Sequence, residues 1–284
     1  MADLYGMTGK IARVDLTSGT VSVVEPGEEI YRKFLGGSAL GAYYLMKEGI
    51  LDPDVDPLGP DNLWQLMIGP VTGAGANPRS VITCKSPYNN FCATTCGGHA
   101  GAELKFAGWD GIQVTGKASS PVYISIVDDN IEIRDASHLW GMEVEEAEII
   151  MKKEVMADIE FREAMIRDAD LTPEWAEMRP PKRLGMHEKR LAHVWLIGVG
   201  GENQVWYAAT MTEGARAHGR HGSGAVAGSK NLKGIVVRGT KGHVLADKKQ
   251  YLGLIKNVQA SQRGNYFWRS YGTPGIGARS AYVE

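Results

Sequence analysis

Cysteine is scarce in this sequence. The 284-residue chain has three cysteines, Cys84, Cys92 and Cys96. So small and odd a number argues against the disulfide framework of small secreted domains and favours a reducing compartment. Cys92 and Cys96 lie close enough in sequence to share a metal, but no third and fourth ligand follow at a suitable spacing. We therefore expect small buried thiols, with a metal role for this pair as the alternative.

The chain also lacks long apolar runs. No stretch approaches the roughly 20 apolar residues that a membrane-spanning helix needs. The N-terminus, MADLYGMTGK, does not show the basic, apolar and small-residue pattern of a secretory signal. Together with the few cysteines, these features predict a cytoplasmic protein that does not associate with a membrane.

Neither sign of charge is in excess. Lysine plus arginine number 31 against 33 for aspartate plus glutamate, which gives a formal net charge of −2. Without a broad positive field, the chain is not expected to bind nucleic acid or an anionic membrane surface. A composition that is 43% hydrophobic and 23% charged is ordinary for a globular protein with an ample core.

The apolar pattern predicts an α+β fold. Alternating apolar residues with turn residues between them predict β-hairpins over about 12–23 and 122–133. Helical spacing predicts one helix between the Gly36–Gly37 pair and Gly49, and another over about 144–155. Further strands are predicted at 63–71, 80–84, 111–115, 193–197, 205–211 and 234–237. We expect mainly antiparallel β-sheets with a few helices.

Glycine, in contrast, is abundant, with 36 residues. The densest stretch, GARAHGRHGSGAVAGSKNLKG at 214–234, also holds two arginines and two histidines. Such a run lets main-chain N–H groups approach a ligand without a Cβ in the way. From Gly222 it is one residue longer than the dinucleotide fingerprint and follows charged residues, and Ser229 interrupts the phosphate-loop pattern. A nicotinamide dehydrogenase is therefore disfavoured.

Several segments, in the same order along the chain as in the family, resemble the N-terminal part of the tungsten-dependent aldehyde:ferredoxin oxidoreductase family. They cover nearly all of residues 6–240 and read GKIARVDLTSG, FLGGSALGAYYL, IGPVTGAGANPRSVITCKSP, GGHAGAELKFAGWDGI, PVYISI, IEIRDASHLWG, GGEN and GAVAGSKNLKGIVVRG. The resemblance implies a β-rich base, built from two sheets, that carries a tungsten (or molybdenum) bis-molybdopterin cofactor. The implied reaction is oxidation of an aldehyde to a carboxylate, with electrons passing through a [4Fe–4S] cluster to ferredoxin.

The resemblance also suggests what the glycine-rich stretch binds. In the family each pterin ends in a phosphate, and a magnesium ion joins the two phosphates. Arg216 and Ala217 match the positions where an arginine contacts phosphate and a backbone carbonyl ligates magnesium. Arg79 matches an arginine between pterin and cluster, and Thr95 or Cys96 matches a polar residue associated with magnesium. The other expected cofactor-binding positions are Gly97, Gly98, Gly219, Arg220 and Gly222.

Some matched residues are expected to support the site from behind. His218 and His221 are interpreted as ordinary loop or supporting residues and not as magnesium ligands, with a catalytic acid as the alternative. His218 departs from the small residue usual at its position. Lys105, Glu202 and Asn203 match the family as well, and they are expected to position backbone as readily as to contact cofactor.

The resemblance further predicts the domain organisation. Residues 1–240 are expected to form the pterin-cofactor-binding domain, with about 156–193 as a surface insertion. Residues 241–284 are expected to begin a truncated helical domain. In the family the cysteine ligands of the cluster and the aspartate motifs of the pterins lie further on, so we expect those ligands outside this chain. The chain is then a fragment, or a short subunit completed by another chain.

Two alternative functions stay open at this point. The first is an aromatic acyl-CoA reductase of the benzoyl-CoA type, which belongs to the same superfamily and runs electrons the opposite way. The second is a non-catalytic scaffold subunit that keeps the fold without the cofactor. Expected partners are ferredoxin or an iron–sulfur subunit and an aldehyde or acyl-CoA substrate, with a homodimer as one option.

Overall fold

The computed structural model describes residues 4–74, 78–88, 90–157, 192–264 and 270. The backbone divides into two compact units, residues 1–244 and 245–284. The second unit contains the helix α8 (Lys248–Arg263). The predicted functional boundary near residue 240 stays a prediction. Within the described residues, no helix combines the length and apolar character that crossing a bilayer requires.

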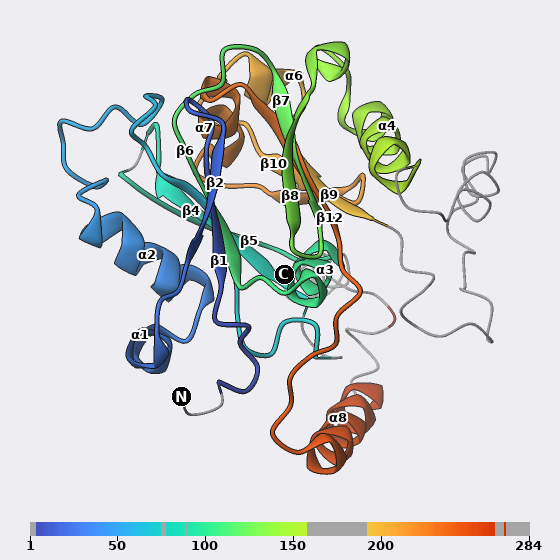
Figure 1. The fold of residues 1–284 in the computed structure, drawn as a ribbon. Helices are drawn as coiled ribbons and strands as arrows, with labels where there is room; N and C mark the ends of the chain where they lie inside the picture. Colours follow the sequence, from blue (N-terminus) through green and yellow to red (C-terminus); the bar gives the residue numbers. More distant parts are fainter. Residues whose placement is uncertain (1–3, 75–77, 89, 158–191, 265–269, 271–284) are drawn as a thin grey trace, which may run out of the picture. The chain divides into compact units, whose positions relative to one another are not determined.

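The first unit is built on two six-stranded sheets (Figure 1). In spatial order, the first sheet contains β2 (Thr20–Val24), β1 (Ile11–Asp15), β6 (Gly111–Thr115), β3 (Trp64–Ile68), β4 (Ser80–Lys85) and β5 (Phe91–Cys96). The second contains β11 (Arg216–His218), β10 (Thr210–Thr212), β9 (His193–Leu196), β12 (Leu232–Arg238), β7 (Val122–Val127) and β8 (Asn130–Asp135). The β1–β6 and β12–β7 pairs are parallel, and the other pairs that join neighbouring strands are antiparallel. The predicted α+β class with mainly antiparallel sheets is therefore confirmed.

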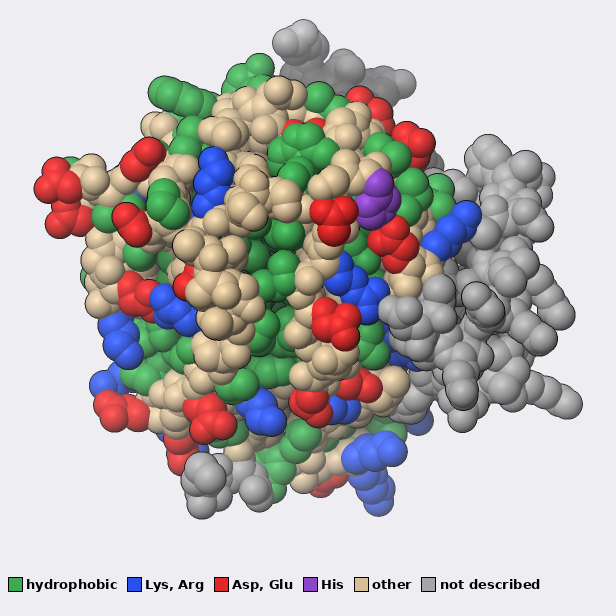
Figure 2. Space-filling model, turned by 45° about the horizontal axis from the view of Figure 1, so that its top comes forward, with side chains coloured by type: hydrophobic (Ala, Val, Ile, Leu, Met, Phe, Trp, Pro, Cys, Tyr) green, Lys and Arg blue, Asp and Glu red, His purple; other side chains and the backbone are tan. Residues whose placement is uncertain are grey.

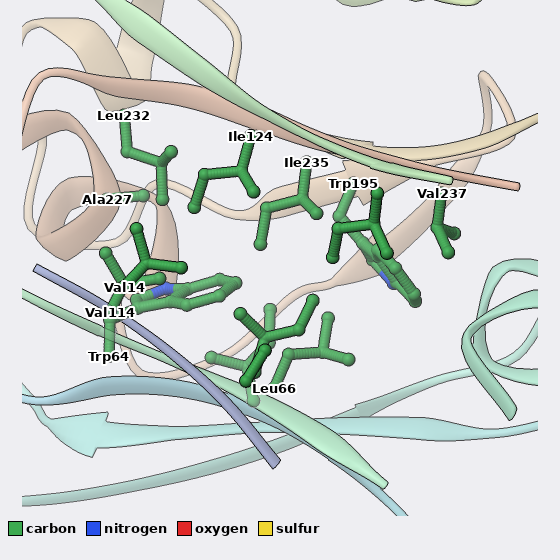
Figure 3. Close-up of a cluster of buried hydrophobic side chains, with 14 of the residues drawn as sticks. Val14, Trp64, Leu66, Val114, Ile124, Trp195, Ala227, Leu232, Ile235 and Val237 are labelled. Carbon is green, nitrogen blue, oxygen red and sulfur yellow. The ribbon is translucent and has the colours of Figure 1, made fainter. Parts of the chain in front are cut away.

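The main hydrophobic core lies between the two sheets. Figure 3 shows side chains of the first sheet, among them Trp64 and Leu66, facing Ile124, Ile235 and Val237 of the second. Burying this much aliphatic and aromatic surface is the main favourable term in folding. Both strand faces of β3 and β12 are covered, so each of these strands is buried throughout its length.

Helices cover the outer faces of the sheets. The helices α1 (Glu28–Phe34) and α2 (Gly37–Lys47) pack against the first sheet, and α4 (Val144–Ala157) packs against the second through β9 and β12 (Figure 1). The remaining helical segments of the first unit's described residues are α3 (Ala100–Ala107), the 3-10 turn η1 (Ser137–Leu139), α6 (Val199–Glu202) and α7 (Ser223–Ser229). Both predicted hairpins and both predicted helices are confirmed.

One predicted strand is largely wrong. The segment 205–211 was expected to be extended, but 205–209 forms turns and β10 begins only at Thr210. The reason is local, because the Ala208 N–H bonds to the Val205 carbonyl and the Ala208 carbonyl accepts the N–H of Gly224 on α7. These turns provide the surface on which α7 packs. The predicted insertion at about 156–193 lies mostly outside the described residues.

Candidate functional site: the seam between the two sheets

The two sheets meet along their edge strands. β5 is the last strand of the first sheet, β11 is the last strand of the second, and the two pack against each other. Three segments predicted to bind cofactor meet here. Residues 95–98 lie at the end of β5, and residues 216–222 include β11. Arg79 directly precedes Ser80, which pairs with Cys96 across β4 and β5. We call the region formed by residues 79, 94–99 and 213–222 the seam. Segments that are far apart in the chain thus form one continuous site.

The predicted residues divide into an exposed and a buried group. Arg216 and Ala217 on β11 and Thr95 on β5 are exposed, as are Gly219 and Arg220. Cys96, Gly98 and Gly222 are buried, Gly97 is intermediate, and Arg79 is exposed. Of the two alternatives for the polar magnesium-associated position, Thr95 therefore offers its hydroxyl on the accessible side of the strand.

The Cys96 thiol lies beneath the charged groups of the seam. Burial raises its pKa, and the positive charges of Arg216 and Arg79 act in the opposite direction. The Arg216 side chain is 57% exposed. Its Nη1 lies 3.4 Å from the point where a Cβ on Gly97 would sit, so a side chain there would press against the guanidinium.

Glu213 is the residue that sequence reasoning missed. Its side chain is 18% exposed, it accepts the backbone N–H of His99, and its Oε1 and Oε2 lie 3.3 Å from His193 Nδ1 and 3.4 Å from Arg216 Nε. A Cβ on Gly98 would come within 2.8 Å of the same carboxylate. Glu213 has a left-handed φ of 50°, which is uncommon for a residue other than glycine. Glu213 thus contacts residues on both sides of the seam. The one feature of the sequence that could have indicated it is an acidic residue three positions before Arg216.

The environment of Glu213 strongly favours its carboxylate form. Burial alone would raise its pKa, but the approach of His193, the His99 amide bond and the charges of the two imidazoles outweigh burial and lower the pKa to about 2. Glu213 is therefore an anion at neutral pH, and it can hold Arg216 by its Nε while more than half of that side chain stays exposed.

Packing explains why positions 222 and 224 are glycines. Gly222 precedes α7 with φ 73°, and a Cβ there would collide with the carbonyl oxygen of Trp206 and with Pro87. Gly224 lies within α7, and a Cβ there would come within 2.5 Å of the Ala209 carbonyl oxygen. The predicted cofactor role of Gly222 stays a prediction, while its conformation and its contacts already require glycine.

The two histidines of the stretch lie behind its exposed residues. His218 is fully buried, and burial lowers its pKa to about 4, so it is neutral at physiological pH. The backbone of His221 joins the loop after β11 to the loop before β5, since its N–H donates to Tyr88 Oη at 2.7 Å and its carbonyl accepts from Ser86 Oγ at 2.9 Å. This placement agrees with their interpretation as supporting residues.

The matched residues outside the seam make contacts within the protein. Lys105 and Asp110 form a buried ion pair at 2.5 Å, in which Lys105 also donates to the Gly6 carbonyl. Glu202 forms a buried ion pair with Lys233 and accepts the Gly141 N–H at 2.7 Å. Asn203 donates to the Val199 carbonyl. Each contact holds backbone segments in place.

The cysteines behave as buried thiols. All three are free and buried. Cys84 and Cys92 face each other across β4 and β5, and hydrogen bonding between them together with burial raises the pKa of Cys84. In the part of the chain that the structure describes, no group of three or more His, Cys, Asp or Glu side chains is arranged to hold a metal ion.

The fold and these segments define a family. A family model described as the N-terminal domain of aldehyde ferredoxin oxidoreductase matches residues 11–169 and 154–239. The chain therefore belongs to the aldehyde ferredoxin oxidoreductase family, and the resemblance noted from the sequence is confirmed.

Individual relatives agree with this assignment. The chain is 42% identical over 256 residues to the tungsten-containing aldehyde ferredoxin oxidoreductase of Thermococcus kodakarensis, covering 89% of this chain and 37% of the relative. The identity and coverage are the same for the protein of that name from Pyrococcus furiosus. The aliphatic sulfonate oxidoreductase, WOR-like subunit, of Pyrococcus furiosus is 40% identical over 239 residues, which are 84% of this chain and 35% of that protein. The chain spans about a third of the length of these relatives.

A solved structure shares the fold. A chain of the active-site complex BamBC of benzoyl coenzyme A reductase, in complex with 1,5-dienoyl-CoA, superimposes with a TM-score of 0.74 at 33% identity. The match covers 93% of this chain and 35% of that chain.

Proposed function

We propose that the first unit forms the N-terminal side of a bis-pterin tungsten (or molybdenum) site in an oxidoreductase that converts aldehydes to carboxylates, with ferredoxin or an iron–sulfur subunit as electron acceptor. The observation that carries the proposal is the seam, where three segments matched to the family's cofactor contacts meet on one edge-to-edge junction. The names of the relatives supply the chemistry, because two of those reported above are called tungsten-containing aldehyde ferredoxin oxidoreductases.

The residues of the seam fit the phosphate end of such a cofactor. Arg216 and Arg220 are exposed cations beside glycine-rich backbone, a combination suited to phosphate. The Thr95 hydroxyl and the Ala217 carbonyl would offer the oxygen ligands that magnesium prefers. Arg79, whose planar fork can donate on two sides, would lie between the pterin and the cluster.

The cofactor and the protein would have separate roles. When bound, such a cofactor would supply the two-electron redox chemistry, and the protein would supply binding and orientation. In this proposal the chain holds the phosphates and magnesium, while the [4Fe–4S] ligands lie outside it. A cytoplasmic location and a homodimer remain predictions.

Reduction of an aromatic acyl-CoA is the second candidate. The structural likeness to a benzoyl coenzyme A reductase complex favours it, since that complex was solved with a CoA thioester. Purification of the full-length protein would separate the two functions, because association with flavin and additional iron–sulfur subunits is expected for the reductase. A non-catalytic scaffold is less well supported, because Arg79 and Arg216 are both retained.

Charges of both signs are mixed on one face of the molecule. On the face shown in Figure 2, acidic and basic side chains are interspersed, and neither sign forms a continuous patch. This agrees with the near balance of charge in the sequence.

Arg216→Ala in the full-length protein tests the proposal. The exposed guanidinium contributes little packing, so the variant should lose pterin while the thermal midpoint of the cofactor-free protein changes little. The matched control is Arg32→Ala, which removes an exposed arginine on α1. Full pterin content in Arg216→Ala, together with a midpoint several degrees lower than the control's, would show that Arg216 is structural and would contradict the proposal.

A further inference from the structure

A buried histidine joins the two edge strands beneath the seam. His218 ends β11 and is fully buried. Its Nδ1 lies 2.9 Å from the carbonyl oxygen of Thr94 on β5, and its Nε2 lies 3.3 Å from Ser80 Oγ on β4. One imidazole of the second sheet therefore contacts two strands of the first.

The chemistry of these partners fixes where the protons lie. A carbonyl oxygen can only accept, so His218 Nδ1 carries the proton and donates to Thr94. Nε2 of the neutral ring is then an acceptor, and Ser80 donates its hydroxyl proton to it. The Ser80 oxygen in turn accepts from Trp195 Nε1 at 3.3 Å. The chain from Trp195 through Ser80 and His218 to Thr94 thus has a single direction, and every donor in it has an acceptor.

The bridge lies one residue from each of two proposed ligand positions. His218 follows Ala217, whose carbonyl is proposed to ligate magnesium, and Thr94 precedes Thr95, which is proposed to contribute its hydroxyl. The backbone N–H of Arg220 also donates to Thr94 Oγ1 at 3.4 Å. The distance between the two ligand positions therefore depends on the contact between His218 and Thr94.

We propose that His218 is a positioning residue that sets the spacing of β5 and β11 and so holds Ala217 and Thr95 at the separation that a phosphate-bound divalent cation requires. The inference rests on the proposed function for the identity of the ligand, while the bridge itself stands on the contacts above. A small side chain at this position would leave the Thr94 carbonyl and the Ser80 hydroxyl buried without their partner, and the edge strands could then separate.

Two substitutions separate hydrogen bonding from size. His218→Phe keeps a ring of similar volume but removes both nitrogens, whereas His218→Gln keeps one donor and one acceptor. Trp195→Phe is the matched control, because it removes the indole donor and some core volume but leaves both bonds of His218. All are made in the full-length protein, loaded with its cofactor where it binds one.

Two quantities are measured on each variant, the rate at which bound magnesium is lost to a chelator and the amide hydrogen exchange of residues 94–98 and 216–220. His218→Phe should accelerate both by about tenfold or more, since an unpaired buried polar group favours local opening of the strands. His218→Gln should lie near the wild type. Trp195→Phe should lower the thermal midpoint yet retain magnesium and protection at the seam.

The outcomes distinguish this inference from the proposed function. A wild-type protein without pterin or magnesium would overturn the proposed function and the cation role of His218 with it, and hydrogen exchange would still report on the bridge. Unchanged magnesium loss and seam exchange in His218→Phe would overturn the positioning role while the proposed function stands, as would equal losses in Trp195→Phe. If His218→Phe does not fold, Ser80→Ala removes one of the two bonds, and seam exchange at the wild-type rate in that variant would overturn the inference.

Discussion

Replacing Glu213 by glutamine tests the electrostatics of the seam directly. The substitution keeps the size of the side chain and an acceptor for the His99 N–H, but it removes the negative charge shared with His193 and Arg216. Because the carboxylate is the favoured form in the fold, the variant should be less stable at neutral pH, by an amount that depends on pH.

The magnitude follows from the pKa. The difference between the ordinary value of 4.5 and about 2 corresponds to at most about 3 kcal/mol. The side chain is 18% exposed and Arg216 is largely solvated, so screening should reduce the effect to about 1–2 kcal/mol. Since the folded-state pKa is lowered, this stability is fully present above the unfolded pKa near 4.5 and is lost as the pH falls toward 2.

Urea unfolding followed by tryptophan fluorescence can measure the effect. The wild-type and Glu213→Gln chains are compared at a series of pH values from 7 down to 2.5. The difference in unfolding free energy should be present in full near pH 5 and shrink toward zero at the acid end. Glu29→Gln, at an exposed ion pair on α1, should change little at any pH. A Glu213→Gln difference that stays constant down to pH 2.5 would refute the reasoning.

Further predictions concern packing, buried charge and electron transfer. Gly228→Ala would drive a Cβ into the carbonyl of the facing α6 segment and should cost roughly 1–3 kcal/mol in urea unfolding, whereas Gly253→Ala, which meets no atom within 4 Å, should raise the helix content seen by circular dichroism. Lys233→Met should destabilise by about 3–5 kcal/mol because the buried Glu202 carboxylate loses its cation, and adding Glu202→Leu should recover much of that loss. Arg79→Lys in the full-length enzyme should keep its pterin but slow ferredoxin reduction more than reduction of an artificial acceptor, and equal losses with both would contradict a bridging role.

The sequence alone predicted the elements that show a clear local pattern of apolar residues. The hairpins β1–β2 and β7–β8 combine alternating apolar residues with short turns that carry Gly19 and Asp128 at positive φ. The helix α4 shows its buried stripe, with Ala147, Met151 and Val155 on the core side. Such patterns are properties of short segments and need no partner to be read.

Other elements depend on partners far away in the chain. α7 lies in the glycine-rich stretch, where the sequence predicts no helix, and Gly224 and Gly228 let this helix approach the backbone of 201–209. The sequence predicted neither β5 nor α3, because alternation in FCATTC is weak and the helical period in AGAELKFA is weak. Their place is set by pairing with β4 and by packing against β12 and β9.

The candidate site could be predicted in its parts but not in its assembly. The structure brings together residues 79, 95–98 and 216–222, which the motif matches named, yet the sequence does not show that β5 and β11 are the edges at which two sheets meet. The sequence predicted neither the contacts of Glu213 nor the buried bridge of His218, because their partners lie on other strands and loops. These partners are His99, His193 and Thr94.

Cofactor analysis of the full-length protein, purified from an anaerobic host, tests the central claim most directly. Tungsten, molybdenum, iron and magnesium are measured together with released pterin on one preparation. The account predicts about one tungsten or molybdenum per chain, with two pterins, one magnesium and four irons. A folded full-length protein that contains neither pterin nor tungsten nor molybdenum would contradict it.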